Sequence, residues 1–333
     1  MKFRLRTCVW EITLACCFSC KYCGSSGGKA RADELTTAEC LDVADQLAEL
    51  GCRRVALIGG EVFMRPDWDA ITSRLTGQGV LVSIITNGWL FTDALIGRMK
   101  AANIESVAVS LDGPKDTHDR YRQAGSFDRA VAAIDRLAAA DIPVSVISTL
   151  NSESAARLEE TYALLRPHPI FAWQLQACSP MGNAAKSGVD FRFDFGQVMR
   201  FVDEHAAEAP FRVGVADNIG YFIGETRING GRFSGCAAGL SGIGIDSVGN
   251  VRGCESLYDP CFNEGSLRER RLRDIWEDPD AFAYNRRFTP DLLTGPCAEC
   301  PMGARCGGGC RQYNYFVHGK LYENPACVQR FRR

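Results

Sequence analysis

Residues 16–23 read Cys-Cys-Phe-Ser-Cys-Lys-Tyr-Cys, and three of these cysteines, Cys16, Cys20 and Cys23, stand at the spacing C-x3-C-x2-C. That spacing suits three corners of one iron-sulfur cube, because thiolates are the ligands that iron-sulfur clusters take. The fourth iron is left without a protein ligand, so it can bind a small chelating group. A zinc knuckle or a set of buried thiols is the alternative that the spacing alone leaves open. The stretch follows a strand-like run at residues 8–13, which places the expected cluster in the loop after a first strand, where barrel enzymes keep their chemistry.

Composition limits the kind of protein that carries such a cluster. A chain of 333 residues has room for about two domains, and 46% hydrophobic with 23% charged residues is ordinary for a globular protein. The formal net charge of -2 gives no support for binding to nucleic acid or to a membrane surface, so neither partner is expected. The sixteen cysteines are many, yet the chain opens MKFRLR without an apolar signal segment or a run of membrane-spanning length. Metal ligation in the cytoplasm therefore explains the cysteines better than exported disulfides do.

Short β-rich runs alternate with helix-like segments between residues 8 and 176. Each run is rich in Val and Ile and is followed by turn residues, which is typical of parallel strands buried on both faces. Thr36 and Glu39 form a capping box ahead of apolar residues at helical spacing, which predicts a helix up to Leu50. Six such units with right-handed crossovers predict an α/β fold, a partial (β/α)6 barrel. The expected strands are 8–13, 54–58, 80–86, 106–111, 144–149 and 171–176.

Tyr22 stands directly before the last cysteine of the motif, and C-x3-C-x2-C with an aromatic residue at that place resembles the radical S-adenosylmethionine (radical SAM) enzymes. The resemblance implies that Cys16, Cys20 and Cys23 ligate a 4Fe-4S cluster, whose open iron binds the amine and carboxylate of SAM. It also implies the partial barrel. In the implied reaction one electron cleaves SAM to methionine and a 5′-deoxyadenosyl radical, which abstracts a hydrogen atom from the substrate. A flavodoxin-type or ferredoxin-type protein is the expected electron donor.

The stretch Gly59-Gly60-Glu61 follows the second expected strand. It is similar to a G-G-E stretch that contacts the SAM amino group in the family. A bare carboxylate beside glycines suits an ammonium that approaches the backbone closely. Taken alone, the same three residues also read as a turn followed by a solvated acid.

Polar residues at later strand ends resemble the rest of the family's SAM pocket. Asn87 follows the third expected strand, and Ser110 and Asp112 lie at the end of the fourth. Short polar side chains there suit the ribose hydroxyls or the methionyl carboxylate, although ordinary turns are the alternative. By position alone, the further candidates for the surroundings of SAM are Arg122, Thr149 and Gln176.

The region after residue 235 is rich in glycine and cysteine and poor in long periodic segments, as in a small domain that metal ligation holds together. Its spacing is C-x12-G-x4-C, a gap, C-x2-C-x5-C-x3-C, a gap and a last C. This resembles the SPASM extension of a radical SAM subfamily, which binds two auxiliary 4Fe-4S clusters, so three clusters are implied in all. The resemblance assigns one auxiliary cluster to Cys297, Cys300, Cys306 and Cys327, and the other to Cys236, Cys254 and Cys310.

The second auxiliary cluster lacks a fourth ligand in this assignment. Cys261 lies close after Cys254 and is the expected ligand, while an open site for a substrate thiolate or amine is the alternative. A structural zinc module is the alternative for the whole region. The expected division of the chain is a barrel at 1–184, a bridging segment at 185–234 with a helix at 195–206, and the iron-sulfur domain at 235–333.

Two further side chains are candidates for contact with the substrate. Glu11, on the first strand, faces the substrate if it points inward, and the sequence does not decide which face it takes. Cys178 ends the sixth strand, where its weak S–H bond suits donation of a hydrogen atom to a substrate radical. A buried small hydrophobe is the alternative for Cys178 and the expected role of Cys8, Cys17, Cys40 and Cys52. The histidines form no ligand-spaced group and are expected at the surface or at helix caps.

A radical that removes one hydrogen atom, joined to a second cluster-bearing module, predicts oxidative chemistry. Enzymes with the SPASM extension act largely on peptides and proteins, so the expected function is maturation of a ribosomally made peptide by crosslinking, oxidation or epimerisation. Few residues precede the first strand, so a leader-binding domain is not expected there, and a separate recognition protein or the barrel rim takes that role. The alternatives are a small-molecule or cofactor-biosynthetic dehydrogenase, an anaerobic sulfatase-maturing enzyme and a non-catalytic iron-sulfur electron carrier.

Overall fold

A computed structural model describes residues 3–216, 218–219 and 235–327, and one ten-stranded sheet forms its centre. The strand order is β10-β9-β8-β1-β2-β3-β4-β5-β6-β7. Neighbours from β8 through β1 to β7 pair in parallel, whereas β9 and β10 pair antiparallel at one end. The strands are β1 (Thr7–Glu11), β2 (Arg54–Ile58), β3 (Leu81–Thr86), β4 (Ser106–Ser110), β5 (Val144–Leu150), β6 (Ala172–Ala177), β7 (Arg212–Val215), β8 (Gly242–Ile245), β9 (Asn250–Arg252) and β10 (Gly265–Ser266).

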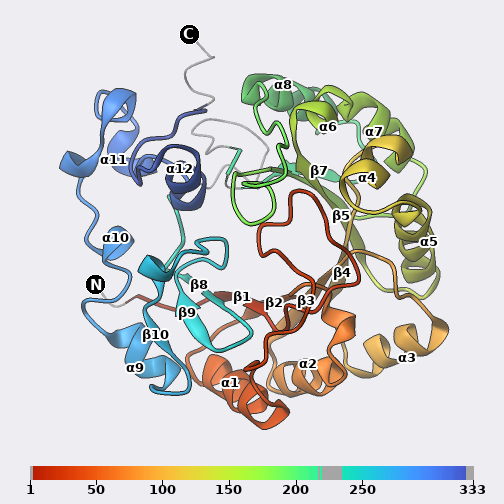
Figure 1. Ribbon diagram of the computed structural model, residues 1–333, viewed down its shortest axis with the longest axis horizontal. Coiled ribbons are helices and arrows are strands. Elements are labelled where there is room, and N and C mark those ends of the chain that lie inside the picture. The colour runs from red at the N-terminus through yellow and green to blue at the C-terminus, as the bar shows by residue number, and fades with distance from the viewer. Residues whose placement is uncertain (1–2, 217, 220–234, 328–333) are drawn as a thin grey trace.

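Helices cover the outer face of the curved sheet in the first two thirds of the chain (Figure 1). They connect successive parallel strands, as the predicted βα units require. The helices are α1 (Thr37–Glu49), α2 (Trp68–Gly77), α3 (Asp93–Ala101), α4 (Lys115–Tyr121), α5 (Ser126–Ala139), α6 (Ser152–Ala156), α7 (Leu158–Leu165) and α8 (Phe195–His205), and a 3-10 turn, η1 (Val62–Met64), follows β2.

The six predicted strands are confirmed, with ends that differ by at most two residues, and α8 matches the predicted helix at 195–206. The capping box of α1 is present. The Thr36 hydroxyl accepts from the Glu39 amide at 3.3 Å, and the Glu39 carboxylate accepts from the Thr36 amide at 2.7 Å. These elements depend on local sequence signals, so the sequence located them well.

The parallel register decides which side chains face the helices. It pairs Trp10 with Leu57 and Leu57 with Ile84, and all three are fully buried in the core under the helices. Side chains alternate along a strand, so Glu11, which pairs with Ile58, lies on the opposite, inner face of the sheet. The structure therefore answers the question that the sequence left open for Glu11.

The C-terminal region does not stand apart as a small domain with little core. Its strand β8 pairs in parallel with β1, from Thr7 opposite Gly242 to Trp10 opposite Ile245. Leu272 and Trp276 of α9 (Leu272–Glu277) belong to the same hydrophobic core as the barrel. The extended sheet therefore lets the C-terminal region share the core of the barrel.

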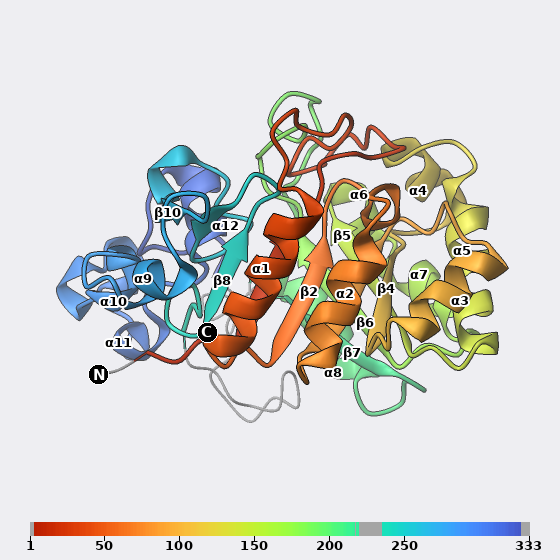
Figure 2. The ribbon, with the colours of Figure 1, turned by 90° about the horizontal axis from the view of Figure 1, so that it is seen from below.

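Short elements complete the described C-terminal region, which lies on one side of the barrel in Figures 1 and 2. They are η3 (Pro260–Phe262), α10 (Ala283–Arg286), η4 (Pro290–Leu292), η5 (Gly295–Cys297), α11 (Gly303–Cys306) and α12 (Arg311–His318). The predicted bridging segment at 185–234 contains α8 and β7, and its last part, 220–234, lies outside the described residues. The domain boundaries remain predictions.

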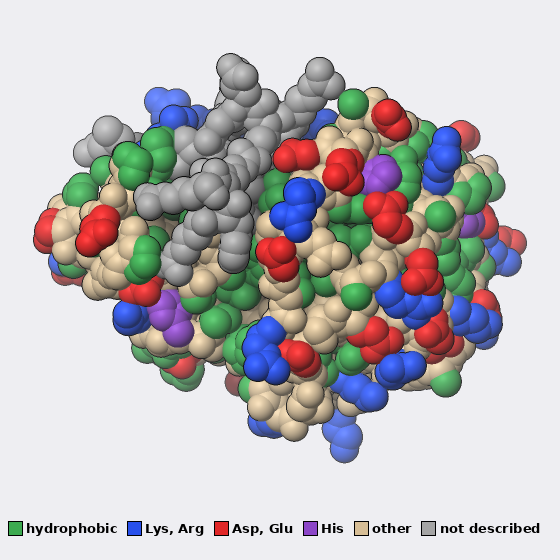
Figure 3. All heavy atoms as spheres, turned by 90° about the horizontal axis from the view of Figure 1, so that it is seen from above, with side chains coloured by type: hydrophobic (Ala, Val, Ile, Leu, Met, Phe, Trp, Pro, Cys, Tyr) green, Lys and Arg blue, Asp and Glu red, His purple; other side chains and the backbone are tan. Residues whose placement is uncertain are grey.

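The surface in Figure 3 carries acidic and basic side chains interspersed over the same face. In the ranges that the structure describes, no helix combines the length and the apolar character that crossing a bilayer requires. Large apolar side chains exposed elsewhere include Leu81 and Phe171, at the amino-terminal ends of β3 and β6.

Candidate functional site

The loop that carries the three motif thiols starts where β1 ends. Its base is closed by two backbone hydrogen bonds, from the Cys16 amide to the Gly28 carbonyl at 2.8 Å and from the Gly28 amide to the Leu14 carbonyl at 3.0 Å. Cys16, Cys20 and Cys23 lie on this closed loop and are partly exposed. The loop thus presents the thiols at the carboxyl end of the parallel sheet, where α/β enzymes bind their ligands.

Amide groups point at the sulfurs of this loop. The Phe18 amide donates to Cys16 Sγ at 3.4 Å, and the Gly27 amide donates to Cys23 Sγ at 3.3 Å. The Asn87 side-chain amide lies 3.4 Å from Cys17 Sγ and 3.9 Å from Cys16 Sγ. Cys17 is thus half-buried and hydrogen-bonded, not a buried hydrophobe as predicted. Three thiols with amide donors around them fit an iron-sulfur cluster, whose sulfurs take such hydrogen bonds.

The two glycines after β2 let the backbone of that strand end touch the base of the loop. The Gly60 amide donates to the Thr13 carbonyl at 2.8 Å, and the Glu61 amide donates to the Ala15 carbonyl at 2.7 Å. A Cβ on Gly60 would lie 2.3 Å from the Ala15 oxygen, and one on Gly59 would lie 2.4 Å from the Thr13 oxygen. Only glycine permits this approach, so these residues position the thiol loop.

Glu61 is buried and its carboxylate is already bonded. It accepts from the Thr86 hydroxyl and from the Asn87 amide, each at 2.8 Å, and from the Phe63 amide at 3.4 Å. Burial raises the Glu61 pKa to about 7, although the hydrogen bonds act in the opposite direction. The expectation of a bare carboxylate is therefore wrong, because the side chain joins the ends of β2 and β3.

Asp112 connects several of the residues predicted around SAM. Its buried carboxylate accepts from the Arg122 guanidinium through Nη2 at 3.1 Å and also through Nε, from the Tyr22 hydroxyl, and from the Thr149 amide at 2.8 Å. Burial alone would raise the Asp112 pKa, but Arg122 and the hydrogen bonds outweigh burial and hold the pKa below its ordinary value. The Arg122 guanidinium also lies 5.6 Å from the Tyr22 ring centroid.

Thr149 and Gln176 lie opposite each other on β5 and β6. The Gln176 side-chain amide donates to the Thr149 hydroxyl at 3.0 Å. Ser110 ends β4 and pairs with Ile147, two residues before Thr149 and hence on the same face of the sheet. The structure therefore places Ser110, Thr149 and Gln176 along neighbouring strand ends on the inner face.

His118 is fully buried, so the prediction that it lies at the surface or at a helix cap is wrong. Its Nδ1 accepts from the Asp112 backbone amide at 3.2 Å, and its ring packs edge-on against Phe127. Burial lowers the His118 pKa to about 4, so the imidazole is neutral near pH 7. The short helix α4 carries too few residues for a readable apolar face, so this burial could not be predicted from the sequence.

The segment after β6, residues 178–187, holds the thiol loop, and the sequence analysis missed this role. Asn183 donates through its side chain to the Cys20 carbonyl at 2.9 Å and through its amide to the Cys23 carbonyl at 2.8 Å. The Ser187 hydroxyl donates to the Lys21 carbonyl at 2.6 Å. Figure 2 shows the loop after β1 and the segment after β6 together above the sheet. The acceptors are backbone carbonyls, which leave no side-chain pattern in the sequence.

Cys178, at the start of this segment, is 2% exposed and packs in a small apolar cluster with Tyr22, with Cys20 alongside. Burial raises the Cys178 pKa to about 12, so the thiol keeps its proton. The same segment also reaches the C-terminal region, because the Gln312 side-chain amide lies 3.1 Å from Met181 Sδ. Cys178 is thus near the thiol loop, as a hydrogen donor has to be.

The C-terminal cysteines fall into groups in space. None of the sixteen cysteines, all of which lie in the described ranges, forms a disulfide. Burial raises the Cys306 pKa to about 11, and the nearby Cys327 and Cys297 raise it further. Cys236 and Cys254 likewise add to the effect of burial in raising the pKa of Tyr284. The remaining cysteines of the pattern are Cys300, three residues before the start of α11, and Cys310, at the start of α12.

Cys261 is exposed, with its sulfur 3.8 Å from the Tyr315 hydroxyl, which donates to Asp259 at 3.0 Å. The Cys261 backbone amide also donates to Asp259, at 3.0 Å. The role of Cys261 as a fourth ligand stays a prediction.

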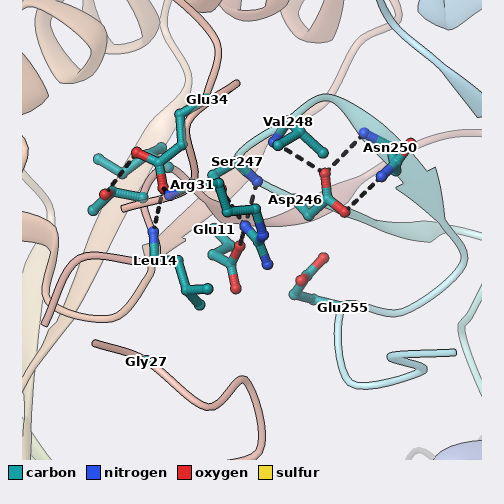
Figure 4. A network of polar contacts seen from close by, with 12 residues as sticks. Glu11, Leu14, Gly27, Arg31, Glu34, Asp246, Ser247, Val248, Asn250 and Glu255 are labelled. Carbon is teal, nitrogen blue, oxygen red and sulfur yellow. Dashed lines mark hydrogen bonds and ion pairs between the residues drawn. The ribbon is translucent and has the colours of Figure 1, made fainter. Parts of the chain in front are cut away.

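A polar network joins the inner face of β1 to the end of β8 (Figure 4). Glu11 accepts from the Arg31 guanidinium at 2.5 Å and from the Ser247 amide at 3.4 Å, and Arg31 also donates to the Ser247 hydroxyl. Glu34 accepts from the Leu14 amide at 2.6 Å and from the Arg31 amide at 3.2 Å. Burial raises the Glu11 pKa, and the Arg31 charge opposes this. The return arm of the thiol loop is thus tied to both strands.

Comparisons with known proteins agree with this arrangement. The family model of the radical SAM superfamily matches residues 10–165, and that of the SPASM iron-sulfur cluster-binding domain matches residues 236–301. The AdoMet-dependent heme synthase of Methanosarcina barkeri is 30% identical over 343 residues, covering 98% of this chain and 97% of that protein. The mycofactocin maturase MftC of Mycobacterium tuberculosis is 30% identical over 328 residues, covering 96% and 82%.

Solved structures show the same fold. SuiB of Streptococcus suis bound to S-adenosylmethionine aligns with a TM-score of 0.80 at 16% identity, over 97% of this chain and 77% of SuiB. The structure of anSMEcpe with bound AdoMet and the Cp18Cys peptide aligns with a TM-score of 0.74 at 16% identity, over 99% and 95%. The iron-sulfur description of residues 236–301 replaces the zinc alternative. The chain belongs to the radical SAM superfamily and carries a SPASM domain, and it is therefore an enzyme that uses SAM, a 4Fe-4S cluster and auxiliary iron-sulfur clusters.

Proposed function

We propose that this enzyme abstracts a hydrogen atom from a residue of a ribosomally made peptide and completes an oxidation such as a crosslink. The observation that carries the proposal is the pairing of β8 with β1. Through it, Glu11, five residues before Cys16, and Glu255, directly after Cys254, come together in one polar network. A radical site and an electron acceptor joined through one network would suit a two-electron oxidation better than simple hydrogen return.

The thiols of Cys16, Cys20 and Cys23 would hold the SAM cluster. When bound, that cluster supplies the electron that cleaves SAM, and the auxiliary clusters supply an acceptor for the electron left on the substrate. Tyr22 would help to shape the cluster loop, because its hydroxyl is fixed on Asp112. Gly59, Gly60 and Glu61 would act mainly by holding the loop in place, leaving backbone carbonyls for the SAM ammonium.

The remaining polar residues would line the SAM pocket from the other side. Asn87 would direct its side-chain amide at the cluster thiolates, while Ser110, Thr149 and Gln176 offer hydroxyl and amide groups to SAM. Arg122 would serve through Asp112, because its guanidinium is already matched by that carboxylate.

Ligation of the auxiliary clusters follows the SPASM spacing. One would be held by four thiols, of which three are already neighbours in the structure, and the other by three thiols with Cys261 as the fourth ligand. Replacing Cys261 with Ala tests this assignment, because loss of iron from one cluster supports it and an unchanged iron content favours the open site. The two ligand sets are Cys297, Cys300, Cys306 and Cys327, and Cys236, Cys254, Cys310 and Cys261.

The maturase MftC supports a peptide as the substrate, since it is a relative at 30% identity across nearly the whole chain. A separate recognition protein would deliver the peptide, and a flavodoxin-type or ferredoxin-type protein would deliver electrons. A second candidate is a step in cofactor biosynthesis, because the heme synthase relative matches at the same identity over 97% of its own length.

The test is mass spectrometry of short peptides encoded beside the gene. They are incubated in heavy water with SAM and the anaerobically reconstituted, reduced enzyme. Loss of two hydrogens supports oxidative crosslinking or desaturation, whereas uptake of one deuterium without that loss indicates epimerisation with Cys178 or another thiol as the donor. If 5′-deoxyadenosine forms but no peptide changes, and a tetrapyrrole precursor is converted to heme, the second candidate replaces the first.

A further inference from the structure

Three carboxylates and two guanidiniums meet where β1 and β8 end. Glu11 pairs with Arg31 at 2.5 Å, and Asp246 pairs with Arg252 at 2.7 Å, while Glu255 reaches Arg252 only at 3.5 Å. The Glu11, Asp246, Glu255 and Arg252 side chains are 0%, 3%, 4% and 6% exposed. Three carboxyl groups thus share two guanidiniums, in surroundings that water screens poorly.

The three carboxyl groups also differ in how many hydrogen bonds their oxygens accept. Asp246 accepts from the Val248 and Asn250 amides, the Asn250 side chain and Arg252, so both of its oxygens are engaged. Glu11 Oε2 and Glu255 Oε2, by contrast, are buried without a hydrogen-bond partner among the described residues. Figure 4 shows Glu11 and Glu255 below Arg31 and Asp246 in the network. Two unpartnered carboxylate oxygens on separate elements are acceptors for a group that carries several N–H donors.

The position of these oxygens connects them with the chemistry. Glu11 lies on the inner face, five residues before Cys16, and Glu255 directly follows Cys254. Arg31 is 21% exposed, so the cluster opens toward solvent beside the thiol loop. The half-buried Tyr258 ring lies over both guanidiniums, at 5.8 Å from Arg31 and 4.6 Å from Arg252, and keeps them in place. A group that enters past Arg31 therefore arrives between the thiol loop and the auxiliary module.

We infer that Glu11 and Glu255 form a binding site for a basic group of the substrate, an ammonium or a guanidinium. This inference rests on the proposed function and narrows it to peptides with a lysine, an arginine or a free amine near the reacting residue. Such a group supplies N–H donors for the two unpartnered oxygens, through charge-assisted hydrogen bonds. A substrate whose polar groups are all carboxylates would meet repulsion here.

Binding of small probes tests the site independently of turnover. Butylguanidinium and its neutral analogue butylurea are titrated into the anaerobically reconstituted wild-type enzyme by calorimetry at constant ionic strength. We expect the cation to bind at least about tenfold more tightly, equivalent to about 1.4 kcal/mol. In Glu11→Gln and Glu255→Gln, with iron content checked, the preference falls to less than about threefold. Glu105→Gln removes a carboxylate that pairs with Arg54 at the surface and serves as the matched control, which keeps the preference.

A second kind of variant removes a positive charge in place of a negative one, so the test does not depend on normal folding of the Gln variants. Arg31→Met leaves Glu11 without its cation, so this variant melts at lower temperature than wild type, and butylguanidinium restores the loss while butylurea does not. Equal affinity for the two probes, a preference that survives in both Gln variants, or absence of rescue in Arg31→Met overturns the inference. These measurements do not depend on peptide modification. If the site fails this test but peptides are modified, the proposed function stands. If the site binds the cation but no peptide is modified, the binding site stands and the proposed function falls.

Discussion

The side-chain amide of Asn183 donates to the carbonyl of Cys20 across 2.9 Å, and this contact ties the segment after β6 to the loop that bears the radical SAM thiols. Residues 163 positions apart thus share the task of shaping one cluster site. The backbone amide of Asn183 adds a second bond, to the Cys23 carbonyl. The loop is held from outside as well as at its own base.

Replacing Asn183 with Ala should loosen this loop. The Cys20 carbonyl then loses a hydrogen bond worth about 1 kcal/mol, so cluster retention falls while the fold remains. Iron retained after brief exposure to air, measured by the visible absorbance of the reconstituted enzyme, checks this. The exposed neighbour Lys186 provides the control, because Lys186→Ala should leave iron retention unchanged.

Replacing Gly60 with Ala should prevent normal assembly of the loop. The new Cβ would lie 2.3 Å from the Ala15 carbonyl oxygen, which belongs to backbone and cannot move aside, so we expect a loss of about 2–3 kcal/mol in stability and poor cluster loading. Gly28→Ala is the matched control in the same loop, since a Cβ there meets nothing within 4 Å. Equal melting temperatures and iron contents for the two variants would contradict the assigned role.

Replacing Asp112 with Asn should leave the nearly buried Arg122 guanidinium without its counter-charge. Breaking such a pair from one side costs about 3–5 kcal/mol, whereas the double variant Asp112→Asn/Arg122→Met should recover at least about 1 kcal/mol of that loss. Thermal unfolding under nitrogen measures both. The exposed pair of Arg98 and Asp69 serves for comparison, and Asp69→Asn should cost less than about 1 kcal/mol. A double variant no more stable than the single one would contradict the interpretation that Asp112 compensates the buried charge of Arg122.

The stability of the protein should fall on acidification partly because of His118. In the folded protein its pKa is about 4, against an ordinary value of 6.5, so between these values the unfolded chain binds the proton and the folded chain does not. The contribution of His118 to the free energy of unfolding is therefore lost as the pH falls below about 6.5. Between pH 7.5 and 5.5 this loss is about 1 kcal/mol, and above pH 7.5 there is no further change. His118→Gln should remove this part of the pH dependence. His168→Gln, a change at a less buried histidine, should not.

The triple variant Cys16→Ala/Cys20→Ala/Cys23→Ala should lose one cluster and keep two. Iron content should fall from about twelve to about eight per chain, with sulfide in equal amount, and cleavage of SAM should cease. Iron and sulfide assays and the yield of 5′-deoxyadenosine provide the measurements. An iron content below about four in the triple variant would mean that the auxiliary clusters depend on the first, contrary to two separately ligated sites.

The sequence predicted what local signals determine. The Val-rich and Ile-rich runs located six strands, and Thr36 with Glu39 located the start of α1, because each signal lies within the element that it specifies. The three-thiol loop and the SPASM cysteines were equally readable, since spacing along the chain carries the chemistry.

What the sequence missed depends on contacts between distant segments. The run Gly242–Ile245 was not among the predicted strands, yet it pairs with β1. A Cβ on Gly244 would lie 2.2 Å from the Glu255 amide nitrogen, so glycine there lets the segment after β9 pass close to β8. Glu255 comes close to Glu11 and Arg31 because of that pairing. The hydrogen bonds of Glu61 were missed for the same reason, because its partners Thr86 and Asn87 come from the next strand.

The place of β1 between β2 and β8 has a consequence for synthesis of the chain. Thr7 pairs with Gly242, so one edge of the first strand waits for a partner that is 235 residues further along the chain. At about 5–20 residues per second, a ribosome needs roughly 12–47 seconds to supply that partner. Until then the thiol loop follows a strand that is unpaired along one edge, so stable loading of iron and sulfide is expected only after translation is nearly complete.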